Sequence, residues 1–152
     1  LPPFLGGYVI GQYELWCPGM SQRIQEDNAT LCSPEIYRDF FKPLDEKLAK
    51  AVPYTLFHLH SSALFLLEEL LDIPGIAVFQ VSRDEGRCRW EDILPQLQRI
   101  QNCGRNLVIK GRISGDESTV LKKWLHPCGL CVQPVVDSLE EAKKMLPKIR
   151  RW

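Results

Sequence analysis

The sequence predicts an α/β fold in which parallel β-strands alternate with α-helices. Short runs of apolar β-formers alternate with longer segments whose apolar residues recur every three or four positions. The strands expected after the first third of the chain begin at residues 54, 76, 106 and 129, at intervals of 22, 30 and 23 residues, which is typical of βα units. One run, residues 76–81, is apolar apart from Gln80, as in a parallel strand covered on both faces. This order indicates a parallel sheet with right-handed crossovers.

The length of the chain, 152 residues, suits a single domain that spans residues 1–152. A chain of this size buries roughly two thirds of its unfolded surface, which is enough for one core. Its 19 basic and 19 acidic residues balance. Because polyanion binding needs a basic surface, we expect no nucleic-acid partner and no binding to a membrane surface. No apolar run approaches the roughly 20 residues of a transmembrane helix.

Six cysteines are scattered along the chain, at positions 17, 32, 88, 103, 128 and 131. A chain with enough apolar residues for its own core does not need disulfides, so we expect reduced thiols and a cytoplasmic location. Cys128 and Cys131 are spaced like a redox or zinc pair. The expected strand 129–134 would place the two thiols near opposite ends of that strand, which disfavours a redox role.

The N-terminal part of the chain is expected to contain one strand and one long helix. Residues 6–16 carry β-formers between glycines and run into a turn signal at residues 17–19. Ser33 then caps a helix, Pro34 takes its first position, and apolar residues recur as far as Val52. Because Pro43 lacks a backbone N–H, we expect a kink there.

Four strand-then-helix units follow. The expected strands are residues 54–60, 76–81, 106–111 and 129–134. The helix after the first of these begins at Ser61 or Ser62 and runs to about residue 72. The last helix extends to the end of the chain and opens with a capping box formed by Ser138 and Glu141.

Two architectures fit this order of elements, an open three-layer sheet and a (β/α) barrel. A closed eight-fold barrel takes about 250 residues, whereas this chain has room for roughly five strands and five helices. If the parent is a TIM-type (β/α)8 barrel, the chain holds about half of it. Half a barrel leaves open strand edges, which invite pairing. We therefore expect either self-association or a complementary N-terminal half-barrel on another chain.

Two histidines are the sharpest signal for chemistry. Both architectures bind ligands at the carboxyl ends of their strands, and His58 and His60 stand at the end of the strand 54–60. Two residues apart on a strand, they point to the same face, as metal ligands or substrate acids would. The alternative is one packed core histidine and one that borders the loop. Cys131 would complete a three-ligand zinc site with an open fourth position if the strand ends converge.

Four more residues at the same edge are candidates. Glu14 is a candidate catalytic base or fourth metal ligand, with a solvated carboxylate as the alternative. Ser61 opens a helix whose free N–H groups suit a carboxylate or phosphate, unless it is an ordinary cap. Gln80, near the end of the strand 76–81, is a candidate substrate-binding residue like Ser61. Arg83 would hold an anionic substrate, with a solvated mixed-charge loop as the alternative.

Two segments carry a family resemblance. Residues 32–43 read CSPEIYRDFFKP, and the next strand ends in FHLH at residues 57–60. Together they resemble the C-terminal half of the uroporphyrinogen decarboxylase superfamily, whose members share a Ser-Pro-Glu, Tyr, Phe and Pro pattern in this helix. That superfamily also contains zinc-dependent methyltransferases, which move methyl groups between corrinoid proteins and thiols.

The resemblance implies a zinc site and a reaction. His58 matches the zinc-binding histidine of the methyltransferases, His60 takes the position of their first zinc cysteine, and Cys131 lies near that of their second. An imidazole in place of a thiolate still binds zinc but lowers the anionic charge at the metal. The implied function is methyl transfer between a corrinoid, carried by a partner, and a small-molecule thiol.

Two other functions stay open. One is a non-catalytic domain that binds a corrinoid, a tetrapyrrole or a protein, and the other is an incomplete fragment of a decarboxylase-like enzyme. Uroporphyrinogen decarboxylation by this chain alone is disfavoured. The resemblance does not include the N-terminal arginine and aspartate motifs of that family, and no His-Gly motif follows the last expected strand.

Overall fold

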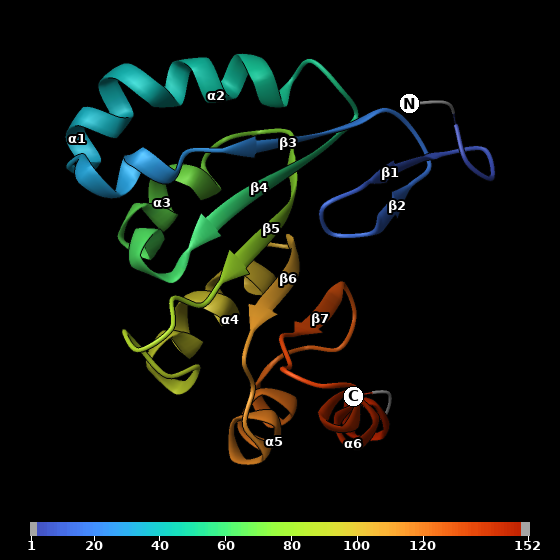
Figure 1. The fold of residues 1–152 in the computed structure, drawn as a ribbon. Helices are drawn as coiled ribbons and strands as arrows, with labels where there is room; N and C mark the ends of the chain where they lie inside the picture. Colours follow the sequence, from blue (N-terminus) through green and yellow to red (C-terminus); the bar gives the residue numbers. More distant parts are fainter. Residues whose placement is uncertain (1–2, 150–152) are drawn as a thin grey trace.

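The computed structural model describes residues 3–149 and contains a five-stranded, all-parallel sheet (Figure 1). Its strands are β3 (Ser21–Gln25), β4 (Tyr54–His60), β5 (Ile76–Ser82), β6 (Asn106–Gly111) and β7 (Leu130–Pro134). The predicted alternation of parallel strands with helices is confirmed. The end of the predicted last helix, residues 150–152, lies outside the described residues.

The strands lie side by side in chain order, from β3 to β7. Each crossover therefore connects two neighbouring strands, and the sheet is open within residues 3–149, with β3 and β7 at its edges. All five carboxyl ends point to the same edge of the sheet, since every pairing is parallel. This edge is where a parallel sheet binds ligands.

The single strand predicted over residues 6–16 is wrong. These residues form an antiparallel hairpin, β1 (Tyr8–Ile10) and β2 (Leu15–Cys17). The reversal lies at residues 11–14, where Glu14 adopts a φ of 53° in the left-handed region. Tyr13 continues the β-forming pattern through the turn, which is why the pattern alone predicts one strand.

The sequence pattern also misses β3, the first strand of the sheet. Its sequence SQRIQ has one apolar residue, Ile24, which is buried, while Arg23 and Gln25 are exposed. An edge strand pairs on one side only, so it can form without the apolar run of a central strand. Gln25 lies opposite His58 in the register. The residues that follow β3 are therefore brought beside the end of β4.

The remaining elements complete the crossovers. A 3₁₀ helix, η1 (Asp27–Leu31), follows β3 and leads to α1 (Pro34–Ile36), the π-helical turn η2 (Tyr37–Phe41) and α2 (Lys42–Ala49). After β4 come η3 (Ser61–Leu66) and α3 (Leu67–Leu71), and after β5 come η4 (Glu91–Ile93) and α4 (Leu94–Asn102). Helix α5 (Gly115–Trp124) follows β6, and α6 (Leu139–Ile149) follows β7.

The long helix predicted from Ser33 forms, and its irregularity lies just before Pro43. The hydroxyl of Ser33 accepts a hydrogen bond from the Ile36 amide at 3.3 Å, as an N-cap does. In the turn that follows, the Lys42 amide donates to the carbonyl of Tyr37, five residues back. A proline ring clashes with the carbonyl four residues back in a regular helix, so a π-turn at this place relieves the clash.

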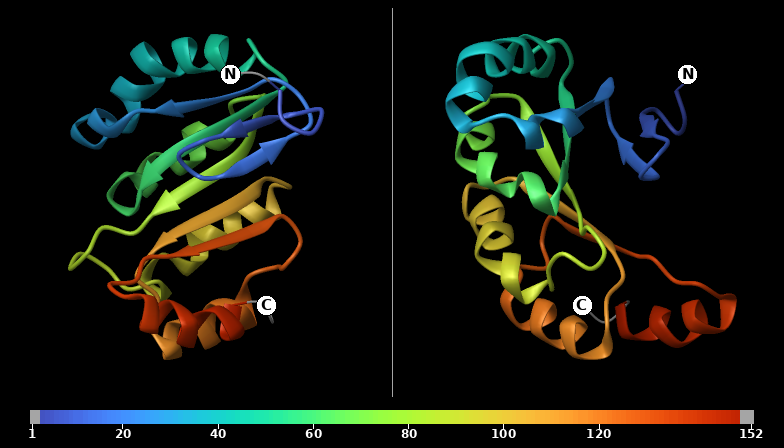
Figure 2. Two further views of the ribbon diagram at one scale, coloured as in Figure 1. Left: turned by 45° about the vertical axis from the view of Figure 1, so that its right-hand side comes forward. Right: turned by 60° about the vertical axis from the view of Figure 1, so that its left-hand side comes forward.

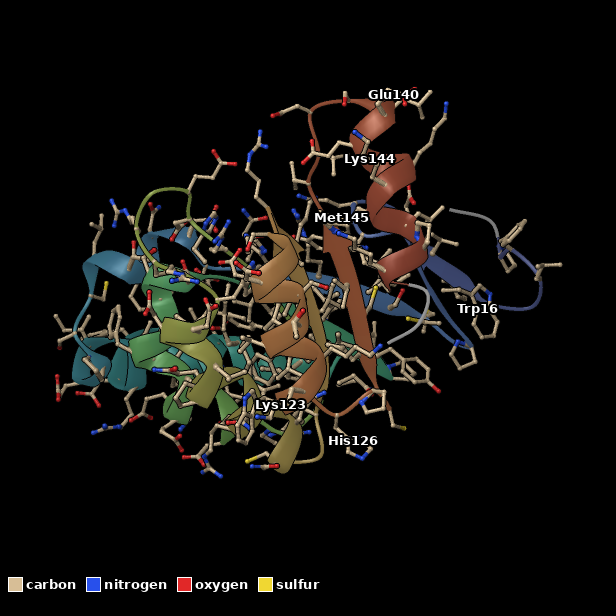
Figure 3. The ribbon with its side chains drawn as sticks, turned by 90° about the horizontal axis from the view of Figure 1, so that it is seen from below. Trp16, Lys123, His126, Glu140, Lys144 and Met145 are labelled. Carbon is tan, nitrogen blue, oxygen red and sulfur yellow. The ribbon has the colours of Figure 1, made fainter. Side chains whose placement is uncertain are left out.

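The sheet has a helical face and a hairpin face. Helices α2 to α5 lie on one side, and the hairpin and α6 lie on the other (Figure 2). Figure 3 shows the same division from below, with Lys123 of α5 on one side of β7 and Trp16 and Met145 on the other. The main core fills the helical side, whereas a smaller core under the hairpin contains Tyr13 and Leu56. None of the helices in residues 3–149 is long and apolar enough to cross a bilayer.

Candidate metal centre

Three side chains meet at the carboxyl ends of β3 and β4 and form a candidate metal centre. His58 and His60 extend from the same face of β4, and Asp27 begins η1 directly after β3. Oδ1 of Asp27 lies 3.7 Å from Nε2 of His58 and 3.8 Å from Nε2 of His60. One ligand atom from each residue fits within a 4.8 Å spread. The predicted projection of both histidines to one face is confirmed.

These distances are close to those of a tetrahedral zinc site. With bonds of about 2.0 to 2.1 Å to zinc, neighbouring ligand atoms lie roughly 3.3 Å apart. The two distances from Asp27 exceed this spacing by a few tenths of an ångström, and the Asp27 side chain is 49% exposed, so it can move. His58 is 6% exposed, which fixes the other side of the site. A small movement of the Asp27 side chain can therefore bring its carboxylate oxygen to ligand spacing from both histidine nitrogens.

Gln80 fixes the tautomer of His58. The Gln80 amide nitrogen donates to Ser82 Oγ at 3.0 Å, which turns the amide oxygen towards Nδ1 of His58 as an acceptor. Nδ1 then carries the proton, and the lone pair of Nε2 points towards Asp27. A hydrogen bond of this kind, from the far nitrogen of a ligating histidine, is a general feature of protein metal sites.

Asp84 does the same for His60. Its Oδ1 accepts from Nδ1 of His60 at 2.6 Å, and its Oδ2 accepts from the Ser61 hydroxyl and the Ser62 amide, each at 3.1 Å. Burial raises the pKa of Asp84, but the hydrogen bonds from His60 and Ser62 outweigh burial and hold the pKa below its usual value. The carboxylate is therefore charged and oriented, and it leaves Nε2 of His60 free for a metal.

Tyr13 covers His58 from the hairpin side. Its hydroxyl lies 2.9 Å from Nδ1 of His58, and the two rings stack with centroids 6.1 Å apart. Burial lowers the pKa of His58, so the imidazole stays neutral, which is the form that binds metals. Burial likewise raises the pKa of the Tyr13 phenol, which stays protonated.

An open pocket lies beside the centre, with a volume of about 380 Å³. Its walls are formed by Asp27, Thr30, Leu31, His60, Ser62, Asp84 and Arg87. This size lies near the low end of the range for small-molecule sites. Arg87 brings a guanidinium to the pocket, opposite in charge to Asp84, which orients His60, and to Asp27, which faces the metal position. A small molecule can therefore reach the open side of the metal centre.

Cys131, the predicted third ligand, is not brought to the histidines. His58 lies opposite Gln80, Gln80 opposite Val108, and Val108 opposite Cys131, so the thiol lies three strands away at the same level. With strands about 4.8 Å apart, this separation is roughly 14 Å along the sheet. Burial also raises the pKa of the Cys131 thiol, which disfavours the thiolate that binds zinc. Asp27 takes the place that the sequence reasoning gave to Cys131.

The other predicted site residues have different places. Gln80 and Ser61 lie at the centre, where they hold His58 and Asp84. Glu14 is exposed on the hairpin turn, next to Tyr13 in the chain, and is not in the metal-binding group. Arg83 donates to Glu117 at 2.8 Å and lies 5.6 Å from the Trp90 ring, so its guanidinium is held inside the protein.

Asp27 is the candidate metal ligand that the sequence reasoning misses. It follows a strand with a single apolar residue, and the polar sequence around it reads as a loop. A strand predicted at residues 21–25 would have been the only sequence signal for Asp27, because it would place this residue at the carboxyl edge of the sheet.

Searches against family models, curated proteins and solved structures returned no match for this chain.

Proposed function

We propose that this chain binds one zinc ion through Asp27, His58 and His60 and uses the open fourth position to activate a small substrate. The observation that carries the proposal is the convergence of two Nε2 atoms on Asp27, with each Nδ1 already held by Gln80 or Asp84. Three protein ligands with an open position are typical of catalytic zinc, whereas structural zinc has four. The pocket beside the half-exposed Asp27 supports the catalytic type.

The charge of the site favours an anionic fourth ligand. A zinc ion with one carboxylate and two neutral imidazoles keeps a net positive charge, which lowers the pKa of a bound water or thiol. Arg87 adds a cation in the same pocket, and it is placed to hold a carboxylate or phosphate of the substrate. The substrate class that fits is a small, anionic molecule with a thiol, or one attacked by the bound water.

Methyl transfer to a thiol is the form of this function that the family resemblance favours. Its support is the motif at residues 32–43, the histidine pair, and a sheet whose strands follow chain order as in one half of a (β/α)8 barrel. In this reaction the chain would hold the thiol as a thiolate at the metal. The methyl group would come from a corrinoid that a partner or a complementary half-barrel carries.

Elemental analysis of the purified, untagged protein tests the metal site. We expect about one zinc per chain after incubation with zinc and dialysis. Asp27→Ala, His58→Ala and His60→Ala should each lose it, and His126→Ala should keep it, because His126 is exposed and outside the cluster. Circular dichroism would check that each variant is folded. A folded wild-type chain that binds no zinc would exclude the proposed function.

Cobalt substitution separates the two kinds of substrate. Co²⁺ takes the same ligands, and a thiolate bound to it gives a sulfur-to-cobalt charge-transfer band in the near ultraviolet. If the substrate is a thiol, 3-mercaptopropionate should produce this band in the wild type and not in His60→Ala. If the site binds Co²⁺ but no added thiol produces the band, the thiol function is excluded. Hydrolysis by a metal-bound hydroxide then becomes the function to assay.

A further inference from the structure

The helix formed by α1, η2 and α2 carries an exposed apolar stripe on the side that faces away from the sheet. Ile36, Phe40, Leu44 and Leu48 are spaced four residues apart and are 47%, 70%, 57% and 47% exposed. The helix runs along the rim of the molecule, and in Figures 1 and 2 no other described element lies over it. Large contiguous apolar patches of this kind mark interaction surfaces.

The π-turn keeps this stripe on one face. In a regular α-helix, residues four apart rotate by roughly 40° at each step, so four such residues would drift by roughly 120° around the axis. The π-turn Tyr37–Phe41 is more loosely wound, so the step from Ile36 to Phe40 rotates less and partly cancels the later drift. The stripe is therefore straighter than the same residues in a regular helix.

Ion pairs tie the other side of the helix to the domain. Arg38 donates to Glu69 at 2.8 Å, and Lys42 lies 3.1 Å from the same carboxylate, which belongs to α3. Tyr37 is buried, and its hydroxyl donates to Asp45 at 2.6 Å. The helix is therefore fixed in orientation, and the stripe remains turned to the outside.

The charges beside the stripe are divided along the helix. Glu35 and Asp39 are exposed at its N-terminal end and Lys47 at its C-terminal end, each one position before a residue of the stripe. Among the described residues, Glu35, Asp39 and Lys47 form no ion pair, whereas Arg38 and Lys50, on the opposite side of the helix, each have one. One end of the stripe is thus flanked by two acids and the other by one base.

From this pattern we propose that the stripe pairs with the same stripe of a second copy of this chain, in antiparallel orientation. A two-fold axis near residue 42 places Ile36 against Leu48 of the other copy and Phe40 against its Leu44. The same axis places each acidic end within one helical turn of the other copy's basic end. A self-complementary patch is what a two-fold interface requires, and opposite charges set the orientation of paired helices.

The division of charge distinguishes this partner from a membrane. Helices that lie on anionic lipid carry many Lys and Arg residues on their polar side, whereas the residues that flank this stripe are two acids and one base. Because one pair of helices buries less than a standard interface of about 1,600 Å², we expect a reversible dimer with a micromolar dissociation constant. The pairing does not depend on the metal centre.

Sedimentation velocity across a concentration series tests the pairing. The wild type should pass from monomer to dimer over the micromolar range, and Phe40→Glu should raise the dissociation constant at least about tenfold. Phe65→Glu is the matched control, because Phe65 is also an exposed aromatic side chain (50%) but lies on η3, off the stripe. Equal thermal unfolding of both variants would show that neither has lost its fold.

A charge exchange tests the orientation. Lys47→Glu should weaken the dimer, because it places acids opposite Glu35 and Asp39, and Asp39→Lys combined with Lys47→Glu should restore it. A wild type that stays monomeric would overturn the proposal. The stripe would then be assigned to binding a helix of another protein. A dimer unaffected by Phe40→Glu would also overturn it, since another face would then hold the copies together. A monomer that sediments with anionic vesicles would reassign the stripe to lipid.

Discussion

Single side chains hold the atoms of the candidate metal centre in place. Asp84 orients His60 by accepting a hydrogen bond from its Nδ1. The Asp84 carboxylate is itself held by a hydroxyl and a backbone amide from the start of η3. Gln80 has the same relation to His58 through its own bond to Ser82. Residues of this kind do not touch a metal, yet they set the tautomer and orientation of the residues that do.

Removing the Asp84 carboxylate should weaken the metal centre without removing a ligand. We expect Asp84→Ala to lower the zinc affinity by about 10- to 100-fold, because the His60 ring loses the acceptor that orients it. Competition with a chromogenic chelator measures this affinity. Asp72→Ala is the control, since the Asp72 side chain is 75% exposed and lies away from the site, at the end of α3. Equal zinc affinity in both variants would contradict the assigned role.

Asp45 should make the stability of the fold depend on pH. It is 1% exposed, and burial together with the charge of Glu26 raises its pKa to about 6, although the hydrogen bond from Tyr37 opposes this. A folded pKa above that of the unfolded chain means that the contribution of Asp45 is full near pH 4 and is lost as the pH rises through about 6.

Asp45→Asn removes this titration and keeps an acceptor for Tyr37. The stability of the wild type relative to this variant should fall by on the order of 2 kcal/mol between pH 4 and pH 7. Urea unfolding at both pH values measures the difference. A constant difference would show that Asp45 is ionised throughout this range.

At the scale of elements, one buried carboxylate joins the loop after β5 to helix α5. Glu117 accepts hydrogen bonds from the Ser114 amide at 2.9 Å, the Trp90 amide at 3.2 Å and Arg83 at 2.8 Å. The first of these belongs to the capping box of α5, and the other two come from the segment between β5 and η4. Arg83 is thereby used for structure, and Arg87 is the arginine that faces the pocket beside the metal centre.

Glu117→Ala should destabilise the fold by about 3 kcal/mol, because it leaves Arg83 and two amides without their acceptor. Asp116→Ala, at the exposed neighbouring position, should change the stability by less than about 0.5 kcal/mol. Chemical unfolding of both variants measures the contrast.

The Glu117 effect should also depend on pH. Burial raises the pKa of Glu117, but the hydrogen bonds from Ser114 and Trp90 outweigh it and leave the pKa below its ordinary value. Its contribution is therefore full above the pKa of the unfolded chain and is lost as the pH falls through the folded pKa. A Glu117→Ala effect that is the same at neutral and strongly acidic pH would contradict this account.

At the scale of the whole molecule, the hairpin covers the face of the sheet that carries the histidines. Tyr13 packs with Leu56 under the hairpin. The Gln133 side-chain amide donates to the backbone carbonyl of Tyr13 at 2.6 Å, and the Lys110 ammonium lies 5.4 Å from the centre of the Tyr13 ring. The Tyr13 side chain thus spans β5 and contacts residues of its two neighbours, β4 and β6. In a closed barrel this face would be covered by other strands, and here the hairpin covers part of it.

Tyr13→Ala should detach the hairpin from the sheet. We expect a loss of about 3 kcal/mol of stability, typical of removing a buried aromatic ring, and faster hydrogen exchange in β1 and β2. Trp16→Ala should cost much less, because Trp16 is on the same hairpin but 49% exposed. If both variants lost the same stability, the packing of Tyr13 would not be what holds the hairpin.

The amino-acid sequence alone predicts the parallel βα order, the helix capped by Ser33, and the histidine pair and Gln80 at the strand ends. These depend on periodicity and on local hydrogen bonds, which neighbouring residues specify. The third candidate ligand depends on the tertiary structure, because strand register separates Cys131 from His58 and an almost wholly polar edge strand places Asp27 beside it. The turn between β1 and β2 contains Tyr13, a strong β-former, so the sequence pattern does not reveal the hairpin. Pairing across a sheet joins residues far apart in the chain, and no local pattern records which strands become neighbours.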